Sequence, residues 1–129
     1  MTGQETALVL WGQGCDEVLA VTWVSHLRAQ GRRVYLVGVS GRRMRGKFGV
    51  GLMCDTGLDQ ALALAAQAAL IVLPCEENAL HRFCRDPRFE ELLLLAGERG
   101  ARFLAHPLAV EFLEALLPAA VIDVMAKEE

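Results

Sequence analysis

The chain has 129 residues, of which 53% are hydrophobic, and a formal net charge of −3. This length suits one compact domain with a sizeable core, and the negative charge argues against a general nucleic-acid-binding surface. The first ten residues lack the basic start and long apolar run of a secretory signal, and no apolar stretch is long enough to span a membrane. We therefore expect a single cytoplasmic domain over residues 1–129 that makes no membrane contact.

The four cysteines, at positions 15, 54, 75 and 84, form no Cys-x-x-Cys pair. Disulfide frameworks belong mainly to small secreted proteins, whereas thiols in the cytoplasm are kept reduced. We therefore expect four free thiols.

Apolar runs typical of buried strands alternate with helix patterns along the whole chain. Strands are predicted over residues 7–11, 34–39, 69–73, 101–105 and 119–124, with a short return strand over 50–54. Helices are predicted after a cap at Asp16, after a Thr56–Asp59 capping pair as far as Gln67, over 78–83, from the Asp86-Pro87 start to Arg99, and over 107–117, before a short polar tail over 125–129.

This alternation predicts an α/β fold: a three-layer flavodoxin-like sandwich, with a parallel sheet of about five strands and helices on both faces. In the strand order 2-1-3-4-5, the first, third and fourth strands are neighbours. Ligands of such sheets bind beyond the carboxyl ends of the strands, so we expect a small-molecule site there. The candidate pocket residues are Cys15, Asp16, Glu17, Cys75, Glu76, Ala105 and His106.

Several segments match a known family in their order and spacing: residues 7–10, 14–18, 27–31, 34–39, 54–55, 70–74 and 86–89, and the corner at Pro107. In these segments the chain resembles the ThiJ/PfpI family. That family has the class I glutamine amidotransferase-like fold and includes the Parkinson-linked deglycase/chaperone protein and the intracellular PfpI proteases. The resemblance covers nearly the whole chain and implies a homodimer; the apolar Trp23 and the edge segment 48–54 are consistent with one.

The family's catalytic residues do not carry over. Leu19 stands where the family has its acid, and Pro74-Cys75-Glu76 stands where it has Pro-Gly-Gly. The nucleophile corner reads Ala105-His106-Pro107, with Ala105 at the cysteine position, or Leu104 in an ungapped alignment. The resemblance therefore implies a degenerate and shortened member: a pseudoenzyme that acts as a binding or interaction module, with no cofactor or metal.

An enzyme function is the alternative. Cys15, Cys75 and His106 follow neighbouring strands, and a nearby histidine or helix N-terminus would lower the pKa of a thiol, which predicts a redox-responsive Cys75 linked to a stress response. Otherwise Cys15 and Cys75 are small buried hydrophobes. A residual small-molecule activity would use His106 and Glu17, although a lone histidine at such a corner is more often a helix cap.

Three further hypotheses are weaker. Cys75, His81 and Cys84 offer three zinc ligands, but a structural site needs a fourth. A Gly-x-Gly turn at residues 12–14 resembles a dinucleotide loop, but Glu17 at the third glycine position would repel a pyrophosphate. The basic loop with Arg42, Arg43, Arg45 and Lys47 is interpreted as a solvated loop or edge hairpin rather than an anion or nucleic-acid site. A receiver domain is rejected because Cys75 stands at its aspartate position.

Overall fold

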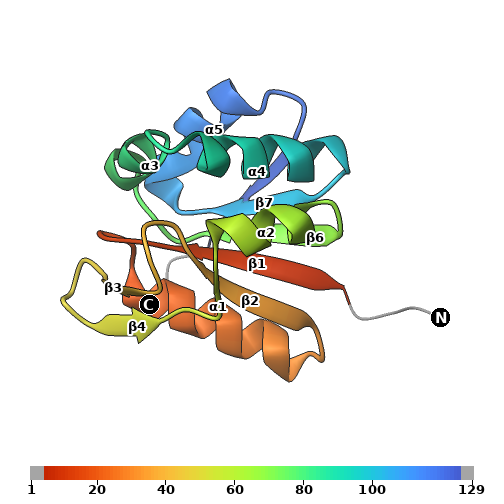
Figure 1. Ribbon diagram of the computed structural model, residues 1–129. Coiled ribbons are helices and arrows are strands. Elements are labelled where there is room, and N and C mark those ends of the chain that lie inside the picture. Colours follow the sequence, from red (N-terminus) through yellow and green to blue (C-terminus); the bar gives the residue numbers. More distant parts are fainter. Residues whose placement is uncertain (1–4, 126–129) are drawn as a thin grey trace.

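The predicted apolar runs form one parallel sheet, because each is long enough for a strand and apolar enough to be covered on both faces. The computed structural model describes residues 5–125, and its six-stranded sheet has the order β5-β2-β1-β6-β7-β8 (Figure 1). The strands are β1 (Thr6–Trp11), β2 (Arg33–Gly38), β5 (Thr56–Gly57), β6 (Ala68–Leu73), β7 (Arg102–Ala105) and β8 (Val121–Val124). The predicted order 2-1-3-4-5 is confirmed, with the short β5 as an additional edge strand.

The helices cover both faces of this sheet. In Figure 1, α1 lies on one side, while α2, α4 and α5 lie on the other, which confirms the three-layer flavodoxin-like sandwich. The helices are α1 (Glu17–Ala29), α2 (Leu58–Ala65), α3 (Glu77–Phe83), α4 (Pro87–Glu98) and α5 (Val110–Leu116), with a 3-10 turn over Pro107–Ala109 before α5. In the part of the chain that the structure describes, no helix has the length and apolar character needed to cross a membrane.

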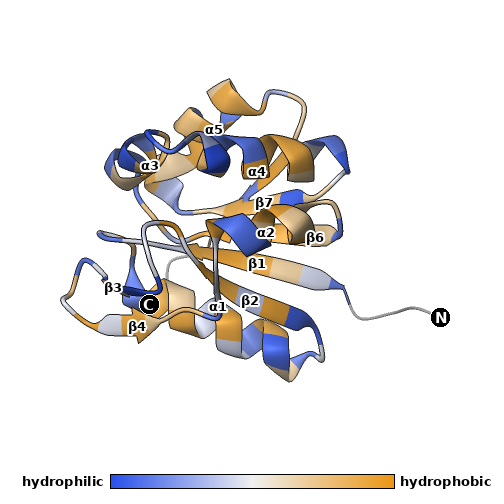
Figure 2. Cartoon of the chain, viewed as in Figure 1, coloured by the Kyte–Doolittle hydropathy of each residue, from blue (hydrophilic) through white to orange (hydrophobic). Residues whose placement is uncertain are grey.

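The core is centred on β1, whose six residues are all buried. Figure 2 shows the hydrophobic colour along much of β1 and β7, whereas α1 and α4 carry hydrophobic and hydrophilic segments side by side. Trp11 and Phe103 are among the largest fully buried side chains. Burial on both faces explains why the strands are near-continuous apolar runs rather than alternating patterns.

The basic loop forms a two-stranded antiparallel hairpin outside the main sheet. Its strands are β3 (Arg43–Arg45) and β4 (Gly51–Met53). The indole Nε1 of Trp11 donates a hydrogen bond of 3.1 Å to the carbonyl of Met44, which fixes the hairpin to the end of β1. This arrangement agrees with the edge hairpin expected for the loop.

Two predicted helix starts are confirmed and one is wrong. Asp16 accepts a hydrogen bond from the Leu19 N–H at 3.1 Å, and Asp86 caps α4. Thr56, however, lies in β5, because its pairing with Val37 holds it extended. Helix α2 begins two residues later, after Gly57, and no side chain caps it. The polar tail lies outside the described residues beyond position 125, as do the first four residues, on which part of the signal-sequence prediction depends.

Candidate functional site

A disulfide links two of the loops at the carboxyl edge of the sheet. Cys15, in the loop after β1, is bonded to Cys75, which follows β6, and their Cα atoms lie 4.2 Å apart. The prediction of four reduced thiols is therefore wrong for this pair, although Cys54 and Cys84 are free. The error has a simple cause: residues 60 positions apart become neighbours only once β1 and β6 pair in the sheet.

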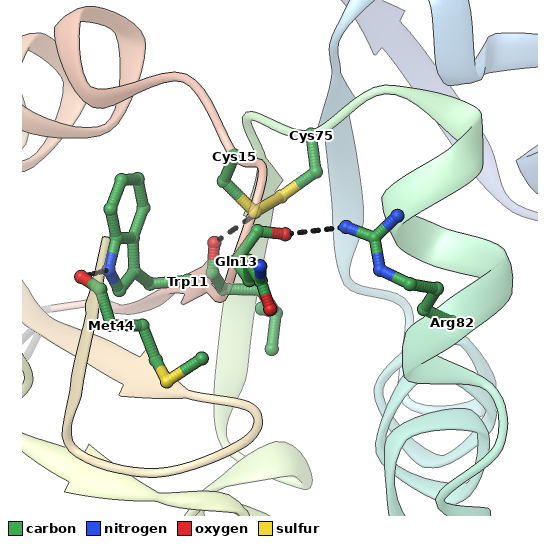
Figure 3. Close-up of a disulfide and its surroundings, with 7 residues drawn as sticks. Trp11, Gln13, Cys15, Met44, Cys75 and Arg82 are labelled. Atoms are coloured by element: carbon green, nitrogen blue, oxygen red, sulfur yellow. Dashed lines mark hydrogen bonds between the residues drawn. A yellow bond between two sulfur atoms is a disulfide. The ribbon is translucent and has the colours of Figure 1, made fainter. Parts of the chain in front are cut away.

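The backbone around the disulfide is tightly bonded. The Asp16 N–H donates to the Pro74 carbonyl at 2.8 Å, so a main-chain bond runs beside the sulfur bridge. The Sγ of Cys75 lies 3.9 Å from the Leu10 carbonyl, which would accept a hydrogen bond from the reduced thiol. Figure 3 shows the bridge, together with the Arg82 guanidinium of α3, which donates to the Gln13 carbonyl at 2.9 Å.

Glu17, at the start of α1, holds the tip of the hairpin. Only 5% of this residue is exposed. Its carboxylate accepts hydrogen bonds from the Val50 N–H at 2.7 Å and from the Phe48 N–H at 3.1 Å. Burial raises the pKa of the Glu17 carboxyl, but these backbone hydrogen bonds and nearby Lys47 outweigh it and hold the pKa below its usual range.

Lys47 ties the same hairpin tip to both sides of the disulfide. Its backbone N–H donates to the Cys15 carbonyl at 2.9 Å, and its Nζ forms an ion pair of 2.9 Å with Glu76, beside Cys75. The hydrogen bond from Lys47 lowers the pKa of Glu76 despite partial burial, and the positive charge of Lys47 contributes in the same direction. The hydrogen bond to Glu76 correspondingly raises the pKa of Lys47.

The corner after β7 carries no cysteine, serine or threonine. Ala105 is fully buried. His106 precedes the 3-10 turn and its ring Nδ1 accepts a hydrogen bond from the Leu108 N–H at 3.0 Å, so this imidazole acts as a cap. The Met125 N–H donates to the Ala105 carbonyl at 2.8 Å, which continues the strand pairing past the corner. Ala105 has no nucleophilic group, and the Nδ1 lone pair of His106 is used by the bond from the Leu108 N–H.

The candidate residues thus fall into one connected group. The disulfide joins Cys15 to Cys75, Asp16 caps α1, and the His106 N–H donates to the carbonyl of Leu73, the last residue of β6, two residues before Cys75. Glu17 points its carboxylate at the hairpin. The chemistry that this group offers is two-electron exchange between a dithiol and a disulfide.

The zinc hypothesis is not supported. Cys75 is bonded to Cys15 and has no thiolate to offer a metal. His81 contacts Glu77 at 3.1 Å and stacks edge-on against Phe112. Among residues 5–125, no group of three or more His, Cys, Asp or Glu side chains is placed to hold a metal ion.

The sequence reasoning missed the part played by the hairpin. Lys47 bonds both Cys15 and Glu76, and the backbone of Phe48 and Val50 bonds Glu17. The sequence pattern predicts only a solvated loop and a dimer edge for these residues. One signal was available: Gly46 lies in the middle of this loop. A Cβ on Gly46 would lie 2.3 Å from the Glu17 Cδ and 2.5 Å from the Cys15 carbonyl oxygen, so only glycine permits this close approach.

Comparison with known proteins bears on the fold. No family model matches the sequence, and no curated protein is significantly similar to it. Among solved structures, oxidised Toxoplasma gondii DJ-1 is 21% identical over 87% of this chain, with a TM-score of 0.74, and this chain spans 61% of its length. Drosophila melanogaster DJ-1beta is 17% identical, with a TM-score of 0.75 and coverage of 98% of this chain and 76% of its own.

The putative protease I from Bacteroides thetaiotaomicron is also similar. It is 12% identical, with a TM-score of 0.71, and the match covers 97% of this chain and 85% of that one. At these identities the likeness establishes a DJ-1/ThiJ/PfpI-like fold, which confirms the resemblance found in the sequence.

Proposed function

We propose that this protein is a ThiJ/PfpI-like binding module without the family's covalent catalysis, and that reversible oxidation of Cys15 and Cys75 controls it. The observation on which the proposal rests is the disulfide, because it joins two of the loops where a sheet of this kind binds its ligands. The proposed compartment is the cytoplasm, where a disulfide is usually transient and redox-sensing rather than structural.

The oxidation step requires a hydroperoxide as the oxidant. The thiolate of one cysteine attacks the peroxide, the O–O bond breaks, and a sulfenic acid and water or an alcohol are formed. The second thiol then attacks that sulfur, the S–O bond breaks, water leaves and the S–S bond forms. The pair loses two electrons and the peroxide gains them. A dithiol reverses the change by thiol–disulfide exchange through a mixed disulfide.

The hairpin connects the redox state to the surface of the protein. Cys15 and Cys75 are fully buried, so an oxidant or reductant reaches them only when the surrounding loops move. The tip of the hairpin is bonded to Cys15 through the Lys47 N–H and to the neighbour of Cys75 through the Lys47 Nζ. Breaking the disulfide would therefore loosen the hairpin as well as the two loops.

The test is to count thiols in the native protein across a series of glutathione buffers, and again after peroxide treatment, by trapping with an alkylating reagent and measuring the intact mass. Cys54 and Cys84 serve as internal references: burial raises the pKa of both thiols, that of Cys54 to about 11, and keeps them protonated at neutral pH. We expect the number of free thiols to change by two across the glutathione series, with a midpoint that belongs to Cys15 and Cys75, while Cys54 and Cys84 remain free thiols throughout.

The matched variants are Cys15→Ser, which should abolish the transition, and Cys84→Ser, which should retain it. A pair that stays oxidised in every native buffer would identify a purely structural bridge. A pair that stays reduced after peroxide treatment would equally contradict the proposed switch.

The absence of catalysis is tested separately. Both oxygens of Glu17 accept hydrogen bonds from the hairpin, which does not support its use as a catalytic acid or base with His106. A screen with methylglyoxal and with peptidase substrates should find no turnover by the wild-type protein or by Cys75→Ser. Turnover by the wild-type protein that Cys75→Ser abolishes would favour a thiol enzyme instead.

We also propose that the protein forms a homodimer. Exposed hydrophobic side chains gather on two neighbouring elements, α1 and the hairpin, which Glu17 joins. A patch of this kind on a protein surface commonly marks an interface. The exposed residues are Val18, Val21, Phe48, Val50 and Met53.

A further inference from the structure

A second site-like feature lies beyond the end of β2, between that strand and helices α2, α3 and α4. It is a cleft with a volume of about 990 Å³. Four arginines line it, although the whole chain has a net charge of −3. They come from separate elements: Arg42 follows β2, Arg82 lies in α3, Arg85 lies between α3 and α4, and Arg88 lies in the first turn of α4.

Only one of these arginines is neutralised by carboxylates. Among the described residues that line the cleft, Asp59 and Asp86 are the acidic ones, and both form ion pairs with Arg88. This bridge joins the first turns of α2 and α4 and so fixes the two walls relative to one another. Within residues 5–125, no ion pair is formed by Arg42, Arg82 or Arg85.

Two of the remaining arginines are held in place by neutral groups. The guanidinium of Arg42 donates to the Asp55 carbonyl at 2.8 Å, and that of Arg82 donates to the Gln13 carbonyl at 2.9 Å. A carbonyl orients a guanidinium without cancelling its charge. Each group has further N–H donors for a ligand, and the planar fork matches the oxygens of a phosphate.

The backbone of the cleft adds further donors. Helix α2 begins with Gly57 at its cap, where no side chain bonds the first-turn N–H groups, and residues 57–60 line the cleft. Uncapped N–H groups and the helix dipole favour an anion at this end. Ser40 and Gly41 also line the cleft, and the exposed Ser40 hydroxyl is one more donor.

We propose that this cleft binds a small organic molecule through its phosphate group, with Arg42, Arg82 and Arg85 as the charged contacts. The inference rests on the proposed binding function and names its ligand class. The volume lies at the upper end of the range for small-molecule sites, so the cleft has room for an organic part as well as the phosphate. Arg82 also links the cleft to the loop that carries Cys15 (Figure 3).

The test uses inorganic phosphate and adenosine 5′-monophosphate as probes. Calorimetry measures the affinity of each probe, and backbone-amide NMR locates where it binds. Both probes should shift the amides of Leu58, Asp59 and Gln60, and the nucleotide should bind more tightly. Arg85→Gln should weaken binding about tenfold or more, since a hydrogen bond to a charged group contributes roughly 1.5–3 kcal/mol. Arg85 is exposed and makes no ion pair, so this variant should fold normally.

Arg33→Gln is the matched control, because it removes the same charge at the amino end of β2, the opposite edge of the sheet. Equal weakening by both variants, or shifts that avoid the cleft, would overturn the proposal. If the nucleotide binds no more tightly than inorganic phosphate, the cleft does not bind the organic part of the ligand, and that part of the proposal is wrong.

Redox titration and phosphate binding, both measured on the wild-type protein with Cys15 and Cys75 intact, separate the two hypotheses. Phosphate binding that persists in a protein whose cysteines show no redox transition would refute only the proposed switch. A redox transition without phosphate binding would refute only the proposal that the cleft binds a phosphate group.

Discussion

Cys15 and Cys75 are 60 residues apart in the sequence, but their Cα atoms lie 4.2 Å apart and their sulfurs are bonded. The parallel pairing of β1 with β6 brings them together, because each cysteine lies in the segment that leaves the carboxyl end of its strand. The loop that the bond closes contains α1, β2, the hairpin and α2. The bridge therefore constrains almost half of the chain.

Reduction of this bond should destabilise the protein. Closing a loop of this length lowers the entropy of the unfolded chain, which corresponds to about 4 kcal/mol at 25 °C in the loop-entropy description. We expect reductant, or Cys75→Ser, to lower the free energy of unfolding by that amount in urea titrations. Cys84→Ser, which removes a free thiol, should have a much smaller effect, and equal losses in the two variants would contradict this account.

The sequence predicted the sheet well because its main strands are long apolar runs separated by clear helix signals. Residues 69–73 and 101–105, for example, became β6 and β7 almost unchanged. Local capping was less predictable. Thr56 looks like a helix cap, but its pairing with β2 overrides that preference, a contact that no local pattern reveals.

At the site, the sequence places Cys15 and Cys75 after neighbouring strands, but it predicts free thiols because the chain has no Cys-x-x-Cys pair and no secretory signal. It also missed the Glu17 contacts and the arginine cleft. Arg42, Arg82 and Arg85 come from different elements, and only the positions of α2, α3 and α4 around the end of β2 bring them to one cleft. Such sites depend on tertiary packing rather than on a motif.

Gly46→Ala should displace the hairpin. The added Cβ would lie within 2.5 Å of the Glu17 carboxyl and the Cys15 carbonyl oxygen, far inside van der Waals contact. We expect faster hydrogen exchange at the Phe48 and Val50 amides, because their bonds to Glu17 would be broken. Gly51→Ala is the control in the same hairpin, since its Cβ would meet only the Arg45 side chain at 4.0 Å. Unchanged exchange in Gly46→Ala would show that the tip adjusts without losing these bonds.

Stability should fall in acid because of Glu17. Burial raises the pKa of its carboxyl, but the backbone hydrogen bonds from Val50 and Phe48 lower it overall. A carboxyl whose native pKa is lowered stabilises the fold above its ordinary pKa, and this stabilisation is lost as the pH falls through the native value. In Glu17→Gln, we expect a lower free energy of unfolding at pH 7 and a weaker pH dependence below roughly pH 4.

Glu111→Gln, on the exposed first turn of α5, provides the comparison for the same charge change. Urea titrations between pH 7 and pH 3 measure both variants. If the two show the same pH dependence, Glu17 is not the group responsible.

The ion pair between Lys47 and Glu76 should contribute less than Glu17 does. Its side chains are 35% and 36% exposed, so water screens their attraction. We expect Lys47→Gln to cost no more than about 1 kcal/mol of unfolding free energy. The backbone bond from the Lys47 N–H to Cys15 remains in this variant, so the Phe48 and Val50 amides should keep their protection from exchange. Loss of that protection would assign the docking of the hairpin to the Lys47 side chain rather than to Glu17.

The proposed dimer should dissociate when charge is placed on its apolar patch. Val21 is 47% exposed on α1, and Val21→Glu would put a carboxylate into the proposed interface, where desolvation of a charge is costly. We expect sedimentation or light scattering to find a dimer for the wild-type chain and a monomer for Val21→Glu. Leu94→Glu, at a residue 40% exposed on α4, is the control and should remain dimeric. A wild-type monomer at micromolar concentration would exclude the interface, and dissociation of Leu94→Glu alone would move it to the α4 side of the sheet.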